Sequence, residues 1–345
     1  MKILIVGPSW VGDAVMSQTL LKLLKENRNS CCIDVLAPSW ALPIFKRMKE
    51  VTTTIELPFA HGEIKIKERK IFAEKIKKNN YDQAIILPNS LKSALIPYFA
   101  DINIRTGWRG EMRYLLLNDL RKLNEVTYPR MIDRFCALGI EPDKEPFQIV
   151  HPSLQIDPEN ISKLLNNYGL KKENKILALC SGAEFGPSKR WPTNFFSRVA
   201  QHYLDKDWTV LSLGSEKDAL ISKEIRENLS KNRDNFVDTT GKTKLEDTVD
   251  LLSACSLVLT NDSGLMHIAS AVEVPLLALF GPTSPEFTPP LGEKSVFIRK
   301  ISGYLKDRIG DLPDGHHSSM ILIKPDEVIS KLESLEQDQD RFKFS

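Results

Sequence analysis

The segment Gly7-Pro8-Ser9-Trp10-Val11-Gly12-Asp13 follows a short apolar run and ends on a carboxylate. Its two glycines are spaced as in a phosphate loop, but Asp13-Ala14 stands where that loop has lysine followed by serine or threonine. A carboxylate there would repel phosphate, and the dinucleotide fingerprint Gly-x-Gly-x-x-Gly is also absent. Asp13 either satisfies free N–H groups at a helix N-terminus or acts as a general base at the bottom of a cleft.

A second candidate segment, Thr260 to His267, follows an apolar run and precedes a helical pattern. Ser263-Gly264 would let backbone N–H groups approach a ligand closely, which favours a cradle for a diphosphate. The alternative is an ordinary helix start, with Asp262 or Ser263 as the cap and His267 as a hydrogen-bonded interior residue. Both interpretations remain open from the residues alone.

A third candidate is the long segment from Cys180 to Pro192, because long loops in compact domains are usually functional. Lys189 and Arg190 could neutralise a leaving diphosphate, as a divalent ion does in metal-dependent transferases. The alternative is solvated surface charge. Two Asp-x-Asp triplets, at 205–207 and 338–340, are discounted as metal ligands because one ends a helix and the other lies in a charged tail. We therefore predict no metal and no cofactor.

Two groups of basic residues could contact anions. The segment 63–80 holds seven lysines and arginines against three glutamates, and it indicates either a solvated helix face or attraction to anionic lipid head groups. The second group, Arg105, Arg109, Arg113 and Arg121, surrounds Gly107-Trp108 and makes an anionic acceptor credible. No stacking motif for single-stranded nucleic acid accompanies it, so we predict no nucleic-acid partner.

The elements that position these segments alternate as in doubly wound α/β lobes. In the first half, apolar runs predict strands at 2–6, 32–36, 53–57, 82–87 and 102–107, with helices at 14–26, 40–49, 63–79 and 90–99. The pattern restarts at Lys175, with strands at 208–213, 236–238, 257–260 and 276–280 and helices at 193–206, 216–229, 244–254 and 264–272. We expect an N-terminal lobe at 1–160, a C-terminal lobe at 161–322, and a closing helix with a charged tail at 323–345.

Composition sets the broad class. The 345 residues are 42% hydrophobic and 27% charged with a net charge of +2, which is typical of folded globular proteins and names no partner. The five cysteines lack Cys-x-x-Cys spacing, which indicates reduced packing residues. The apolar run at Ile3–Val6 is too short for a signal peptide or a membrane span, so we expect a cytoplasmic protein.

Several segments together resemble the ADP-heptose:lipopolysaccharide heptosyltransferases of glycosyltransferase family 9, in order from residue 1 to about 325. They are the three candidate segments above, Leu87-Pro88-Asn89-Ser90, Arg105 to Glu111 and Gly281-Pro282-Thr283-Ser284-Pro285. The resemblance implies a GT-B fold, in which two Rossmann-like lobes face a central cleft. It also implies an inverting, metal-independent transfer from ADP-heptose to the first heptose of an inner-core acceptor built on Kdo-lipid A. That acceptor implies peripheral contact with the cytoplasmic face of the inner membrane.

The resemblance also implies residue roles. Asp13 is the expected base and Lys189 the expected diphosphate partner. The expected donor-binding residues are Gly182, Glu184, Lys189, Gly214, Ser215, Thr240, Gly241, Asp262, Ser263, Gly264, Leu265, Met266 and His267. The expected acceptor-binding residues are Ser9, Trp10, Gly12, Asn89, Lys92, Arg109 and Arg113.

Three alternatives compete with this function. The first is a heptosyltransferase that adds the first heptose, or another core transferase of the same family. The second is a non-catalytic sugar-nucleotide binding protein, which would bind the donor without turnover. The third, an NAD oxidoreductase, is disfavoured by the missing glycine fingerprint.

Overall fold

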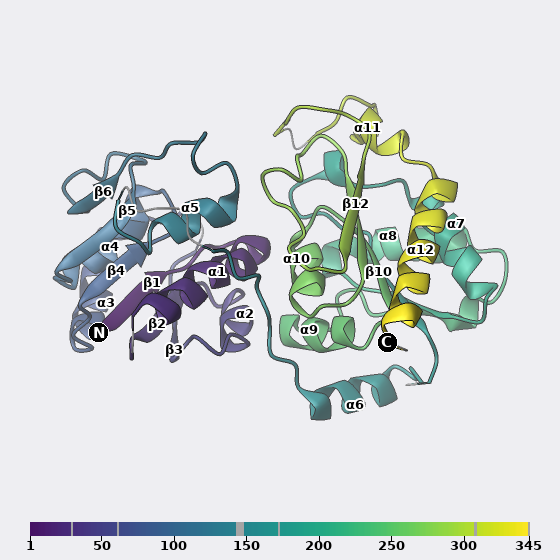
Figure 1. Cartoon of the computed structure of the whole chain (residues 1–345), viewed down its shortest axis with the longest axis horizontal. Helices are drawn as coiled ribbons and strands as arrows, with labels where there is room; N and C mark the ends of the chain where they lie inside the picture. Colours follow the sequence, from purple (N-terminus) through teal and green to yellow (C-terminus); the bar gives the residue numbers. More distant parts are fainter. Residues whose placement is uncertain (29, 61, 143–147, 172, 307–308, 344–345) are drawn as a thin grey trace. The chain divides into compact units, whose positions relative to one another are not determined.

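The computed structural model describes residues 1–28, 30–60, 62–142, 148–171, 173–306 and 309–343. The chain divides into two compact units, Met1–Pro152 and Ser153–Ser345, and each contains a six-stranded sheet with helices on both faces (Figure 1). All neighbouring strands run parallel. Two doubly wound parallel sheets were predicted, and that prediction is confirmed.

Unit 1 has the sheet order β3-β2-β1-β4-β5-β6. Its strands are β1 (Lys2–Val6), β2 (Cys32–Ala37), β3 (Thr53–Glu56), β4 (Gln83–Ile86), β5 (Ile104–Trp108) and β6 (Asp119–Arg121). Its helices are α1 (Val11–Asn27), α2 (Leu42–Lys46), α3 (Ile66–Lys77), α4 (Leu91–Phe99) and α5 (Met131–Ala137). Leu4, Leu36 and Ile86 of the sheet pack with Ala73 and Ala94, so α3 and α4 cover one face with a buried apolar layer.

Unit 2 repeats this order as β12-β11-β10-β7-β8-β9. Its strands are β7 (Ile176–Cys180), β8 (Thr209–Ser212), β9 (Phe236–Asp238), β10 (Leu257–Asn261), β11 (Leu276–Phe280) and β12 (Ser295–Arg299). Its α-helices are α6 (Pro158–Asn167), α7 (Thr193–Leu204), α8 (Ala219–Glu227), α9 (Leu245–Ser253), α10 (Gly264–Ala271), α11 (Ser318–Ile321) and α12 (Pro325–Lys343), and its short 3₁₀ helices are η1 (Pro187–Lys189), η2 (Glu216–Asp218) and η3 (Arg233–Asn235). Leu177, Leu259 and Leu279 face α7 and α12 in one core.

Both sheets therefore have a topological switch point, between β1 and β4 in unit 1 and between β7 and β10 in unit 2. Ligands of such sheets bind at the carboxyl ends of the strands beside this point. The loops that follow β1, β4, β7 and β10 are consequently the places to examine for a site.

The elements differ from the predicted ones in several places. Helix α1 begins at Val11, so Gly12 and Asp13 lie in its first turn and not in a preceding loop. Strands β6 and β12 and helices α5, α6 and α11 were not predicted. The predicted boundary at 160/161 falls inside α6, whose Asn160 donates to Asp247 and Asp250 of unit 2 at 3.0 and 2.8 Å. Helix α12 continues to Lys343, where we predicted a charged tail after about residue 336.

Candidate active site

The switch point of unit 2 is held together by Asn261, the last residue of β10. Its Nδ2 donates to the Ser181 carbonyl oxygen at 2.7 Å, and its Oδ1 accepts from the Trp191 backbone N–H at 3.2 Å. Asn261 is fully buried, so both bonds form away from water and are strengthened by the low dielectric constant. Asn261 thereby fixes both ends of the Cys180–Pro192 segment relative to β10.

The turn η1 directs Lys189 toward the end of β10. The Lys189 Nζ atom lies 2.6 Å from Oδ2 of Asp262, and the two side chains are 15% and 5% exposed. The Thr283 hydroxyl donates to the same Oδ2 atom, also at 2.6 Å. Asp262 therefore does not cap α10 with its side chain, which was one of the two sequence interpretations. Instead it anchors the lysine that we expected to meet a diphosphate.

The first turn of α10 has no capping side chain. Ser263 is the N-cap residue in an extended conformation, and its hydroxyl accepts no cap hydrogen bond. Ser263, Gly264 and Leu265 are half-buried, whereas the Met266 side chain belongs to the core. A helix N-terminus whose N–H groups are not used by a cap is suited to bind phosphate oxygens. The cradle for a diphosphate stays a prediction at this helix start.

His267 lies one turn into α10 and is 5% exposed. Burial lowers the pKa of His267 to about 4, against the opposing effect of the Asp262 carboxylate, and the Lys189 ammonium lowers it further. The imidazole is therefore neutral near pH 7. It is an interior residue beside the Lys189–Asp262 pair.

Three predicted donor residues gather around Asp218, which the sequence analysis did not single out. The Ser215 backbone N–H and hydroxyl both donate to Asp218 Oδ2, at 2.9 and 2.8 Å. A Cβ atom on Gly182 would lie 2.3 Å from the Asp218 carboxylate, so only glycine fits there. Gly214 also packs against Asp218. The sequence signal was present, because serine followed three positions later by an acidic residue is a capping box.

The loop after β9 joins this group through its backbone. The Gly241 N–H donates to the Gly214 carbonyl oxygen at 3.0 Å, and Gly241 has φ +70°, a conformation that favours glycine. The Thr240 hydroxyl donates to Asp238 at 2.6 Å, so it is already engaged. Glu184 is exposed and pairs with Lys217 at 2.5 Å. Ser215 and Gly241 are exposed as well, so three of the predicted donor residues reach the surface.

In unit 1, the predicted acceptor residues after β1 lie at the start of α1. Trp10 is the N-cap residue and is 49% exposed, and Asp13 is half-buried in the first turn. The Ser9 carbonyl oxygen accepts from Trp40 Nε1 at 2.9 Å, which ties this loop to the end of β2. Two partly exposed indoles thus flank the segment that carries the expected base.

The structure places Arg113 differently from the prediction that it binds the acceptor. It is 1% exposed, and its guanidinium donates to the carbonyl oxygens of Pro88 and Trp108 at 2.6 Å and to Asn89 Oδ1 at 3.1 Å. Burial lowers its pKa to about 10, against the nearby Glu111 carboxylate, so Arg113 stays charged at pH 7. Arg113 therefore positions the loops after β4 and β5 and does not present its charge to an acceptor. Asn89, which it holds, is exposed.

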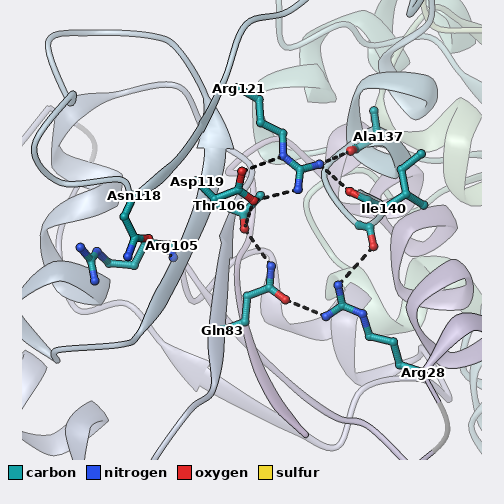
Figure 2. Close-up of polar contacts among 10 residues, drawn as sticks. Arg28, Gln83, Arg105, Thr106, Asn118, Asp119, Arg121, Ala137 and Ile140 are labelled. Carbon is teal, nitrogen blue, oxygen red and sulfur yellow. Dashed lines mark hydrogen bonds and ion pairs between the residues drawn. The ribbon is translucent and has the colours of Figure 1, made fainter. Parts of the chain in front are cut away.

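The predicted basic group around Gly107-Trp108 also needs correction. Figure 2 shows Arg121 bound to Asp119 and to the carbonyl oxygens of Ala137 and Ile140, at 2.6 to 3.1 Å. Arg105 donates to the carbonyl oxygens of Leu116 and Ile102 at 2.8 and 2.5 Å. These arginines hold the unit together, because guanidinium groups satisfy several carbonyls at once. Arg109 is exposed and Lys92 half-buried, so these two remain as acceptor candidates.

The network in Figure 2 crosses unit 1. Arg28 donates to Gln83 at 2.6 Å, Gln83 to Thr106 at 2.8 Å, and Thr106 to Asp119 at 2.8 Å. Burial alone would raise the pKa of Asp119, but hydrogen bonds from Arg121 and Thr106 hold it below its ordinary value. The network is linked to Arg109, because the Arg109 N–H donates to the Arg121 carbonyl oxygen at 2.6 Å.

Among the residues that the structure describes, no three His, Cys, Asp or Glu side chains are grouped so as to hold a metal ion. No helix in the same residues is both long and apolar enough to cross a membrane.

Comparison with known proteins confirms the predicted family. The family model described as glycosyltransferase family 9 (heptosyltransferase) matches residues 69–309. Lipooligosaccharide heptosyltransferase 2 of Haemophilus influenzae is 46% identical, with 97% of this chain and 99% of that protein covered. Lipopolysaccharide heptosyltransferase 2 of Salmonella typhimurium is 44% identical, with 97% and 98% covered.

A solved structure agrees over the same extent. The structure of E. coli ADP-heptose lps heptosyltransferase II has a TM-score of 0.90 with this chain at 40% identity, and 99% of this chain and 100% of that chain are covered. The predicted pair of Rossmann-like lobes and the predicted enzyme class are both confirmed by this match. The chain therefore belongs to glycosyltransferase family 9, the heptosyltransferases.

Proposed function

We propose that this glycosyltransferase moves a heptose from ADP-heptose to the first heptose of the lipopolysaccharide inner core, and so adds the second heptose. The observation that carries the proposal is the similarity along 97% of the chain to proteins named heptosyltransferase 2. The acceptor is then a heptosyl-Kdo-lipid A, which places the reaction at the cytoplasmic face of the inner membrane. The first-heptose alternative is disfavoured by the same similarity.

Unit 2 binds the donor in this proposal. The N–H groups of Ser263, Gly264 and Leu265 contact the diphosphate at the start of α10, where the helix dipole favours negative charge. Lys189 supplies a full positive charge to the leaving group. The loops around Asp218, at Gly182, Gly214 and Ser215, and the Thr240-Gly241 loop contact the adenosine and ribose, since they end β7, β8 and β9 at the same edge.

Unit 1 binds the acceptor. The acceptor hydroxyl attacks C1 of the donor heptose while the bond between C1 and the diphosphate oxygen breaks. The hydroxyl proton passes to the Asp13 carboxylate, and the electron pair of the broken bond leaves with ADP. A helix N-terminus stabilises the charged form of Asp13 and so weakens it as a base, a cost that desolvation by the bound acceptor offsets in part.

The charge on the leaving group is balanced by protein groups in this mechanism. Lys189 and the α10 N–H groups do the work that a divalent ion does in other transferases. The rate is consequently expected to survive exhaustive chelation, measured as heptose transfer before and after treatment with EDTA. A rate that is lost and then restored by added magnesium would contradict this part of the proposal.

Contact with the membrane is part of the proposal. Helix α3 and the residues before it expose Ile64, Ile66 and Ile71, which are 52%, 53% and 67% exposed. Lys67, Lys70 and Lys75 are exposed on the same helix. Apolar side chains between lysines fit an anionic lipid surface, to which each cation adds about 1 kcal/mol.

Sedimentation with vesicles tests this contact. The chain is expected to sediment with vesicles of phosphatidylglycerol and phosphatidylethanolamine and not with phosphatidylcholine alone. The triple variant K67E/K70E/K75E should stay in the supernatant. A control with the same charge change on exposed lysines of unit 2, K223E/K231E/K331E, should sediment like the unaltered chain. Equal behaviour of the two triple variants would remove α3 from the proposal.

The reaction itself is tested by mass spectrometry. ADP-heptose is incubated with a mono-heptosylated Kdo-lipid A acceptor and, separately, with an acceptor that lacks the first heptose. One heptose added only to the first acceptor supports the proposal. Transfer only to the second acceptor would identify a first-heptose enzyme, and ADP binding without transfer to either would favour a binding protein.

A further inference from the structure

The loop after β11 carries a segment, Gly281-Pro282-Thr283-Ser284-Pro285, to which the proposed function assigns no role. Thr283 is 4% exposed, and its hydroxyl donates to Asp262 Oδ2 at 2.6 Å. The same oxygen accepts from Lys189 Nζ at 2.6 Å. One carboxylate oxygen thus receives two donors, one charged and one neutral, from two different loops.

Close packing holds the Thr283 loop in place. A Cβ atom on Gly281 would lie 2.5 Å from the Met320 sulfur, so this backbone lies directly against α11. The Leu305 N–H donates to the Pro282 carbonyl oxygen at 2.9 Å. Strand β11, which the Thr283 loop follows, also holds Asp262, because the Asp262 N–H donates to the Leu279 carbonyl oxygen at 3.1 Å. The Thr283 hydroxyl is therefore presented to Asp262 by a rigid support.

The Lys189–Asp262 ion pair must open before Lys189 can attract a diphosphate fully. While Lys189 stays on Asp262, the two opposite charges cancel, and the pair offers a diphosphate little net attraction. Lys189 attracts the diphosphate fully only when its ammonium turns away from Asp262. The Asp262 carboxylate is 5% exposed, so water cannot replace the lost partner, and a buried carboxylate without a donor is costly. The Thr283 hydroxyl is a donor that remains.

We propose that Thr283 is a positioning residue: its hydroxyl holds the Asp262 carboxylate when Lys189 turns to the donor's diphosphate, and so Thr283 sets donor affinity through Lys189. The inference rests on the proposed function, because it takes a nucleoside diphosphate as the ligand of unit 2. It predicts that loss of the hydroxyl raises the free energy of the nucleotide-bound state more than that of the free protein. In the bound state Thr283 is the remaining donor to the Asp262 carboxylate, whereas in the free protein Lys189 donates to it as well.

The experiment measures the Kd for ADP by calorimetry and the KM for ADP-heptose in the full chain. Thr283→Val removes the hydroxyl at nearly constant volume and is expected to raise both constants about tenfold, the effect of losing one hydrogen bond to a charged group. Thr283→Ser keeps the hydroxyl and should stay within about twofold of the unaltered chain. If Thr283→Val does not fold, Thr283→Ala removes the hydroxyl without placing a methyl group against Asp262.

Thr209→Val is the matched control. Thr209 is a buried threonine that begins β8, whereas the candidate site lies beyond the carboxyl ends of the strands. A merely structural Thr283 would lower Tm in the Val variant and leave Kd and KM unchanged, and that outcome overturns the inference. Equal loss of affinity in the Ser and Val variants also overturns it, since a shape effect would then explain both.

A second measurement tests the route through Lys189. In a Lys189→Ala background, no ammonium leaves Asp262 on binding, so Thr283→Val should change the Kd for ADP by less than about twofold. A tenfold effect that persists in this background overturns the inference. Failure of the proposed function is recognised separately: the unaltered chain would then transfer no heptose, whatever the Thr283 variants do to ADP binding.

Discussion

Lys189 and Asp262 are 73 positions apart in the chain, and their side chains meet with Nζ 2.6 Å from Oδ2. The pair lies where β7 and β10 adjoin at the switch point of unit 2. A buried ion pair of this kind contributes little net stability, because desolvation offsets the attraction. Its presence here fits the proposed delivery of positive charge from Lys189 to the donor.

Replacing Lys189 by alanine should weaken donor affinity and rate together. The diphosphate loses its full positive charge, and Asp262 is left buried with only Thr283 as donor. We expect kcat/KM to fall about 100-fold and the free energy of unfolding to fall by about 3 kcal/mol. Steady-state kinetics and urea denaturation measure the two effects. Lys217→Ala, which removes an exposed lysine paired with Glu184, should change neither by much.

Replacing Asp13 by asparagine should abolish most turnover and retain donor binding. Asparagine keeps the shape and can still accept a hydrogen bond but cannot take the acceptor proton. We expect kcat to fall by at least about 100-fold with an unchanged Kd for ADP. Asp101→Asn, an exposed aspartate after α4, serves as the control. Near-normal transfer by the Asp13 variant would remove the base assignment.

Acidification should destabilise the fold through His267. In the unfolded chain this imidazole binds a proton near pH 6.5, whereas in the folded chain its pKa is about 4. Between these values the unfolded state binds more protons, so stability falls as the pH falls from 6.5 toward 4. The loss attributable to His267 between pH 7 and pH 5 is at most about 2 kcal/mol. Urea denaturation at both pH values, compared with His267→Gln, should show a smaller loss in the variant.

Arg113 and Arg109 should behave differently although both belong to one predicted basic group. Arg113→Met leaves several buried carbonyl oxygens without a donor, and we expect it to lower the free energy of unfolding by about 3 kcal/mol. Arg109→Met removes an exposed cation and should leave stability nearly unchanged. If Arg109 contacts an anionic acceptor, its variant raises the acceptor KM. Thermal unfolding and acceptor titrations separate the two.

The strands that the sequence predicted well are those with continuous apolar runs, such as Leu257–Asn261 and Leu276–Phe280. Strand β6, Asp119-Leu120-Arg121, has no such run. It is a strand because β5 pairs with it and because the Thr106 hydroxyl of β5 donates to Asp119. Local periodicity could not reveal this, since both causes are tertiary.

The candidate site likewise combines features that the sequence predicts with features that only the folded chain reveals. The positions of Lys189 and of the start of α10 after their strands were predictable from sequence order, since each loop follows an apolar strand. The bond from Thr283 to Asp262 was not, because it joins loops 21 positions apart. Arg113 was misassigned for a related reason: its sequence neighbours suggest a basic surface, and only the folded loops show carbonyl oxygens surrounding its guanidinium.

The network of Figure 2 has a consequence for how unit 1 forms during synthesis. Its members are spread from Arg28 through Gln83 and Asp119 to the carbonyl oxygen of Ile140. Arg28, near the start of the chain, emerges from the ribosome long before the partners of Arg121 do. The network closes only after residue 140 has left the exit tunnel, so Arg121 lacks the carbonyl oxygens of Ala137 and Ile140 until then, although the last strand of the sheet has already emerged.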